Sequence, residues 1–106
     1  MFTTEDLLSL DYFTVLQEGE EQIEIQSNNT RHCWRIVFNG PGFYVLYHKH
    51  HMDDPFHYQC SYPTLFDIVL EIVNHDEFQL RGRKPAKYAW QTRNSYFDEL
   101  PRSYSA

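Results

Sequence analysis

Histidine is concentrated in one short stretch of this chain. Four of its six histidines lie within the ten-residue run HKHHMDDPFH, namely His48, His50, His51 and His57. Asp53 and Asp54 lie inside the same run, and Cys60 follows it. Imidazole titrates near neutral pH and is a common ligand of transition metals in proteins. This run is therefore the first candidate for a chemically active site.

Two expected strands, residues 43–50 and 56–60, would position these imidazoles. Residues two apart in a strand share a face, and directly paired residues of a hairpin do the same. We therefore expect His48, His50 and His57 on one face, where three imidazoles would suit zinc, nickel or copper. The same alternation places Cys60 opposite His57. The alternative interpretation is a polar, solvent-facing sheet surface, because the paired ligand spacing of structural zinc sites is missing.

Alternation of period two recurs along the first sixty residues and predicts a series of strands. Expected strands span residues 11–17, 22–27, 32–39, 43–50 and 56–60. Turn residues such as Asn28-Asn29 and the run Asn39 to Gly42 separate neighbouring strands, which favours an antiparallel meander. Residues 3–10 are typical of a short helix that Thr3 or Thr4 would cap.

A long helix is expected over residues 63–75. Thr64 and Asp67 resemble a capping box at its start. Apolar residues with a period of 3.6 form one stripe along it: Leu65, Ile68, Val69, Ile72 and Val73. His75-Asp76-Glu77 is expected to end the helix, where the helix dipole favours a histidine. Residues 78–80 would then form a sixth strand or an extended edge.

Together these elements predict a single α+β domain over residues 1–106. Its antiparallel meander sheet would have five or six strands, with the long helix across one face and the short N-terminal helix before it. The helix-covered face is expected to hold Phe13, Val15, Ile23, Ile25, Ile36, Phe38, Val45 and Tyr47. The opposite face would stay open and carry Arg35, Tyr44, His48, His50 and His57. From about residue 85 the periodicity weakens, so a less regular extension is expected.

Charge is unevenly distributed along a chain of net charge −6. Residues 1–30 contain acidic side chains but no lysine or arginine, whereas the segment RGRKPAKYAWQTR at 81–93 contains cations and no acid. Cations contact phosphates and aromatic rings stack on bases, so this segment is a candidate for binding nucleic acid or an acidic partner. Its candidate residues are Arg81, Arg83, Lys84, Lys87, Tyr88 and Trp90. The alternative is that these cations are solvated or pair with the chain's own acidic third.

Composition and missing motifs limit the function classes. The chain is 42% hydrophobic and 17% aromatic, which is typical of a globular fold. It has no apolar run of about 20 residues that would cross a membrane. Its two cysteines lack a C-x-x-C spacing, which favours reduced thiols and a cytoplasmic location. It has no nucleotide loop, hydrolase elbow or zinc signature.

We therefore interpret the chain as a small, non-enzymatic interaction or regulatory protein. It would act on a protein partner or a second copy through the open His/Tyr-rich sheet face. Two alternatives stay open. One is a nucleic-acid-associated regulator that uses residues 81–93. The other is a protein that binds zinc or nickel through the hairpin of His48, His50 and His57.

Overall fold

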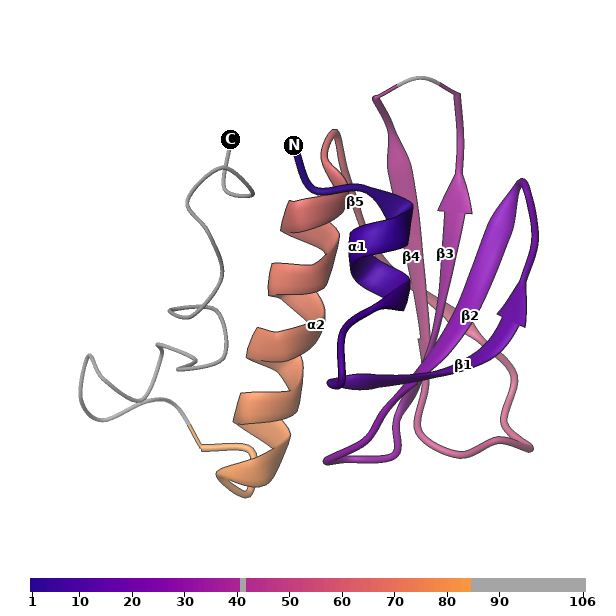
Figure 1. Cartoon of the computed structure of the whole chain (residues 1–106). Helices are drawn as coiled ribbons and strands as arrows, with labels where there is room; N and C mark the ends of the chain where they lie inside the picture. The colour runs from indigo at the N-terminus through magenta and orange to yellow at the C-terminus, as the bar shows by residue number, and fades with distance from the viewer. Residues whose placement is uncertain (41, 85–106) are drawn as a thin grey trace.

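A computed structural model describes residues 1–40 and 42–84, which form a sheet layer and a helix layer (Figure 1). One five-stranded antiparallel sheet has the order β1-β2-β3-β4-β5, and both helices lie on the same side of it. The elements are α1 (Thr4–Leu8), β1 (Phe13–Glu18), β2 (Gln22–Ser27), β3 (Cys33–Phe38), β4 (Tyr44–Lys49), β5 (His57–Tyr62) and α2 (Leu65–Leu80). The predicted α+β meander with one long and one short helix is confirmed.

Alternating isoleucines fix the orientation of the central strands. Ile23 and Ile25 of β2 are fully buried, and their sequence neighbours are more exposed. They pair with Ile36 and Trp34 of β3, which are also fully buried. Directly paired residues share a face, so these four side chains form the middle of the core beneath the helices.

Both helices begin at a threonine cap. Thr3 and Asp6 form a reciprocal capping box at the start of α1, and Thr64 accepts a bond from the backbone of Asp67 in α2. The apolar stripe of α2 then packs onto the sheet with the buried residues Leu65, Ile68, Val69, Ile72 and Val73. Within the described residues, no helix is long and apolar enough to cross a membrane.

The predicted end of α2 was wrong. The helix continues past His75 to Leu80, so residues 78–80 are helical and do not form a sixth strand. Asp76 is 0% exposed and lies eleven residues after Leu65, which continues the buried stripe for another turn. Hydroxyl groups from outside the helix donate hydrogen bonds to its carboxylate. The helix can therefore bury this charged residue and continue past it.

The predicted orientation of β4 was also wrong. Leu46 and His48 point into the helix-covered core, and Val45 and Tyr47 lie on the open face. Leu46 pairs with the fully buried Ile36, which establishes the face. Both faces of this strand carry apolar or aromatic residues, so alternation alone did not identify the buried one. As a result His48, expected on the open face, lies under α2.

Val15 was expected in the core but is 40% exposed. It lies in β1, an edge strand of which only Phe13 is buried. The register of β1 with β2 also shifts between Val15 and Gln17. The helices therefore cover only the beginning of this strand.

A bulge between β4 and β5 changes which side chains of β5 share a face. His57 pairs with His48 and Cys60 pairs with Leu46, with the register shift between Leu46 and Tyr47. His48 and Leu46 are two residues apart, whereas His57 and Cys60 are three apart. The extra residue places His57 and Cys60 on the same face, which corrects the prediction from strict alternation.

Candidate metal centre

Five histidines from four elements or their ends meet between the sheet and α2. The histidine cluster consists of His32, His48, His50, His57 and His75. His48 is at its centre: its ring centroid lies 5.0 Å from those of His32, His50 and His57, and 4.5 Å from that of His75. The remaining histidine, His51, touches only the periphery, 6.4 Å from His50.

Each ring nitrogen of His48 faces another histidine. Its Nε2 lies 3.0 Å from Nδ1 of His32, and its Nδ1 lies 3.3 Å from Nε2 of His57. His48 is 1% exposed and His32 is 6% exposed, so the first of these contacts is shielded from water. The two contacts fix the plane of the central imidazole.

Trp34 of β3 forms the floor of the cluster. Its ring lies 4.3 Å from His48 and 5.2 Å, edge-on, from His75. The indole Nε1 donates a hydrogen bond to the Ser27 hydroxyl at 2.9 Å, so the ring is held in place. Among the described residues, none bonds the buried Nδ1 of His75. An unsatisfied buried nitrogen is uncommon in native structures and is often found where an ion or water binds.

Burial keeps the inner histidines neutral at pH 7. It lowers the pKa of His32 and of His75, and the neighbouring imidazoles lower both further. The pKa of His48 falls to about 3, first because it is buried and then because four histidines surround it. Neutral imidazoles retain the lone pairs that a metal ion requires.

This neutrality makes the metal-free fold sensitive to acid. His48 has a lower pKa when folded than when unfolded, so below about pH 6.5 the unfolded chain binds the extra proton first. We expect the free energy of unfolding to fall by about 2–3 kcal/mol between about pH 7 and about pH 4.5 from His48 alone. Buried His32 and His75 add to the loss, and Asp76 opposes it because burial raises its pKa. Denaturant titrations with a chelator present measure this slope, and His48→Gln should flatten it. An equally steep slope in that variant would contradict the assignment.

Two sets of side chains in the described residues bring three ligand atoms within 4.8 Å of one another. One set is His32, His48 and His50, and the other is His32, His75 and Asp76. Donor atoms around tetrahedral zinc are about 3.3 Å apart when the bonds are about 2.0 Å long. Small rotations of the side chains would therefore close the first set around an ion.

Asp76 acts primarily as a structural anchor. Its two carboxylate oxygens accept hydrogen bonds from the hydroxyls of Tyr12 at 2.7 Å and Thr30 at 2.9 Å. These contacts tie α2 to the region before β1 and to the β2–β3 turn. Since both oxygens of Asp76 are engaged, the set of three histidines is the better candidate for an ion.

A polar pocket of about 490 Å³ opens beside the cluster. Two of the candidate ligands, His32 and His50, line it. The other lining residues are Gln26, Thr30, Arg31, His51, Met52 and Gln79. An ion bound by the three histidines would therefore have access to solvent on this side.

No family model, curated protein or solved structure matches this chain. The function must therefore be inferred from the geometry of the site.

Of the predicted metal ligands, His48 and His50 belong to the candidate set. His57 also lies on the face of His48, and it contacts Nδ1 of His48 from outside the set. The prediction that these three imidazoles come together is confirmed. The prediction that they lie on an open face is wrong, because α2 contributes His75 to the cluster and His48 is buried.

Sequence reasoning missed His32 and His75 as members of the cluster, although both carried a signal. His32 is two residues before Trp34, so it shares the buried face of β3. His75 is three residues after Ile72, so it extends the apolar stripe of α2. His75 was expected to end the helix, and His32, at the start of the expected strand 32–39, was assigned no role.

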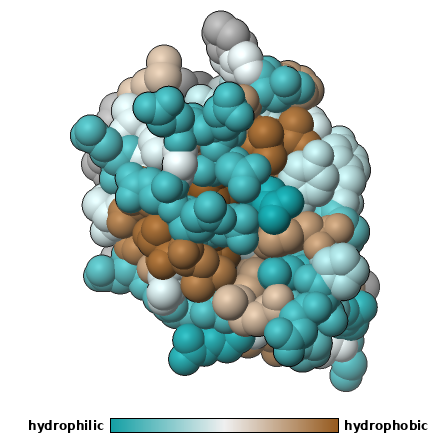
Figure 2. Space-filling model, turned by 90° about the vertical axis from the view of Figure 1, so that its right-hand side faces the viewer, coloured by the Kyte–Doolittle hydropathy of each residue, from teal (hydrophilic) through white to brown (hydrophobic). Residues whose placement is uncertain are grey.

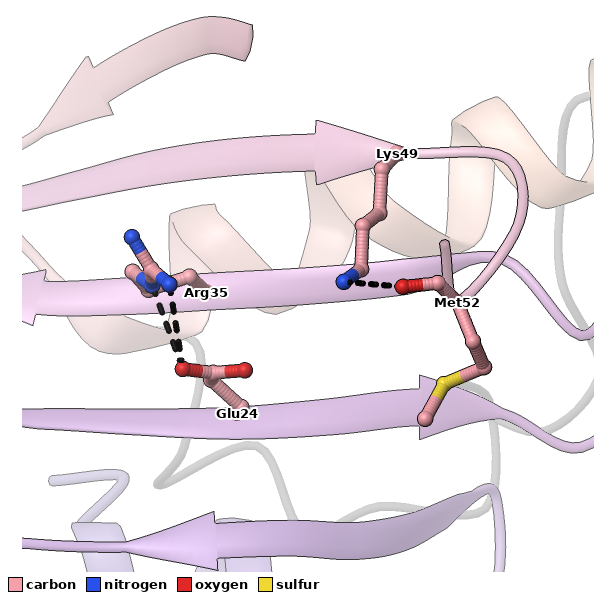
Figure 3. A network of polar contacts seen from close by, with 4 residues as sticks. All are labelled: Glu24, Arg35, Lys49 and Met52. Carbon is pink, nitrogen blue, oxygen red and sulfur yellow. Dashed lines mark hydrogen bonds and ion pairs between the residues drawn. The ribbon is translucent and has the colours of Figure 1, made fainter. Parts of the chain in front are cut away.

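Arg35 and Tyr44 do not belong to the cluster. Arg35 lies on the open face, where its guanidinium is 3.2 Å from Glu24 and 4.4 Å from the centre of the Phe56 ring. On the same face, Lys49 donates to the backbone of Met52 (Figure 3). Tyr44 lies on the opposite face and packs edge-on against Phe38. These two predicted binding residues are therefore separated by the sheet.

The predicted basic segment is only partly described. Arg81 pairs with Glu77 at 4.0 Å, Lys84 is exposed, and Nη2 of Arg83 lies 3.4 Å from Nε2 of His50. Arg83 therefore reaches the histidine cluster. The predicted residues Lys87, Tyr88 and Trp90 lie outside the described residues.

Neither cysteine is a ready nucleophile. Both are free thiols. Burial raises the pKa of Cys33 and raises that of Cys60 to about 12, so both remain protonated near neutral pH. A thiol must lose its proton to attack a substrate or bind a metal ion, so cysteine chemistry at this site is disfavoured.

Proposed function

We propose that this protein binds one divalent transition-metal ion, Zn²⁺ or Ni²⁺, through His32, His48 and His50. The observation that carries the proposal is the histidine cluster itself, in which three imidazoles already have ligand atoms within 4.8 Å of one another. His57 would orient His48, because a bond from Nδ1–H of His48 to His57 leaves the lone pair on Nε2. The unsatisfied Nδ1 of His75 beside this set further supports an ion binding here.

The pocket supports a site with an exchangeable ligand. Structural zinc sites are closed by four protein ligands, whereas sites that act on a ligand keep one position open. Here the first set supplies three histidines, and two of them line a pocket that is open to solvent. The proposed site therefore resembles one that presents a metal ion to a small molecule.

Metal binding should stabilise the fold measurably. At a free Zn²⁺ or Ni²⁺ concentration about 100 times Kd, binding adds about 2.7 kcal/mol, and the melting temperature of a domain this size should rise by about 10 °C or more. His48→Ala and His50→Ala should each abolish most of the rise. His51→Ala is the matched control, because His51 touches only the edge of the cluster. The same thermal shift in His50→Ala as in wild type would overturn the proposal.

A second candidate function rests on the open face of the sheet. Figure 2 shows this side of the molecule, where hydrophobic and hydrophilic side chains are interspersed. Tyr58 is 60% exposed there, and the rings of Tyr58 and Tyr47 meet edge-on. This surface suits contact with a protein partner or a second copy better than contact with a metal ion. If it mediates self-association, Tyr58→Glu should lower the apparent mass in sedimentation experiments at a fixed protein concentration.

A further inference from the structure

The charge of the proposed centre determines what its open position can bind. An imidazole that binds a metal ion through its lone pair contributes no negative charge, so a Zn²⁺ or Ni²⁺ ion bound by three of them would keep its full charge of two. The carboxylate of Asp76, which lies close to His32 and His75, already accepts bonds from Tyr12 and Thr30. A ligand in the remaining position is therefore favoured if it is an anion.

Two arginines lie beside the candidate site. Arg31 lines the pocket beside His32 and His50, and Arg83 places Nη2 3.4 Å from Nε2 of His50. In the described part of the chain, no carboxylate pairs with either guanidinium. Nε of Arg83 donates to Oε1 of Gln79 at 3.1 Å, so the other N–H groups of Arg83 and the guanidinium of Arg31 are the donors that an incoming anion would meet.

The backbone holds both arginines in an unusual conformation. Arg31 has a φ of 67° and Arg83 a φ of 64°, and they are the only described residues other than glycine with positive φ. An L-residue adopts this region at a cost in energy, and such residues cluster at functional sites. The two strained positions flank the same histidine cluster from two separate turns. This coincidence supports a role for the arginines at the pocket.

We propose that the pocket binds a small oxyanion, such as a carboxylate or phosphate group, on the metal ion and between Arg31 and Arg83. One oxygen of the anion would take the open metal position, and guanidinium groups bind the other oxygens with paired hydrogen bonds. Gln26, Thr30 and Gln79 add polar groups to the same pocket wall. This inference rests on the proposed metal site and specifies the class of ligand that the site would accept.

The test uses the full chain loaded with Co²⁺, whose visible absorption reports the ligands around the ion. Sulfate and acetate serve as probes, and each should change the visible spectrum in a saturable way. We expect Arg31→Ala to weaken sulfate binding by about tenfold, as expected for the loss of a charge-assisted hydrogen bond. Arg83→Ala should also weaken it. Arg35→Ala is the matched control, because Arg35 pairs with Glu24 on the opposite face.

The outcomes separate the two proposals. A Co²⁺ spectrum that is unchanged by protein would overturn the metal site and this inference together. A clear spectrum of bound Co²⁺ that neither anion alters would leave the metal site standing and overturn the oxyanion proposal. Equal loss of sulfate binding in Arg31→Ala and Arg35→Ala would also overturn it, because the effect would then reflect overall charge. Melting curves of each variant show whether it is folded.

Discussion

Replacing Trp34 with alanine should destabilise the fold by about 3–5 kcal/mol, a large fraction of the stability of a small domain. Trp34 is 0% exposed and contacts both His48 and His75. Its removal would leave a cavity beneath the histidine cluster and would take away the indole N–H that donates to the Ser27 hydroxyl. Urea titration of the metal-free protein measures the loss. We expect Zn²⁺ to stabilise the variant less than wild type, because the floor of the cluster is gone.

Trp34→Phe separates the two contributions of this residue. Phenylalanine retains an aromatic ring against His48 but cannot donate to Ser27. We expect it to cost about 1–2 kcal/mol and to keep most of the metal-induced shift. A Trp34→Ala variant within about 1 kcal/mol of wild type would show that this ring does not support the core as described.

Replacing Asp76 with alanine should cost about 3 kcal/mol, an unusually large effect for a charged residue in a helix. Asp76 is buried, and its carboxylate accepts bonds from Tyr12 and Thr30. Without it, both part-buried hydroxyls lose their acceptor, which carries a desolvation cost. Urea titration at neutral pH measures the effect. Glu77→Ala is the matched control on the same helix, and we expect it to cost less than about 0.5 kcal/mol.

A double-mutant cycle tests the mechanism of this loss. Tyr12→Phe removes one partner of the carboxylate without opening a cavity. Asp76→Ala combined with Tyr12→Phe should therefore destabilise the fold by less than the sum of the single changes, with a coupling of about 1–2 kcal/mol. Strict additivity would show that the 2.7 Å contact between Tyr12 and Asp76 contributes little to stability.

Sequence periodicity predicted the elements of this fold well but not all of their orientations. Strands such as β2 have isoleucine on one face and polar residues on the other. This pattern predicts both the strand and which of its faces is buried. In β4, aromatic, aliphatic and histidine side chains occupy both faces, and a simple count of hydrophobic residues favoured Val45 and Tyr47. The structure instead buries Leu46 and His48. A neutral histidine whose ring nitrogens have hydrogen-bond partners can be buried at modest cost. A hydropathy scale counts every histidine as polar, so it does not predict this burial.

The histidine cluster was predicted only in part, for the same physical reasons. His48, His50 and His57 are close in sequence, so a hairpin is enough to bring them together. His32 and His75 reach them from β3 and α2 through contacts that depend on how the helix lies across the sheet. Arg31 at the pocket and Arg83 beside His50 both have a backbone with positive φ, and the turn residues in the sequence did not indicate which residue would adopt it.

The bulge in β5 means that the composition of the cluster depends on strand length as well as on residue identity. Because β5 carries one extra residue opposite β4, His57 reaches His48 while Cys60 still packs into the core at Leu46. A one-residue insertion or deletion along this edge would exchange an imidazole for a neighbouring side chain without substituting any histidine. Related chains could therefore gain or lose the outer histidine through a change in spacing that a comparison of residue identities alone would overlook.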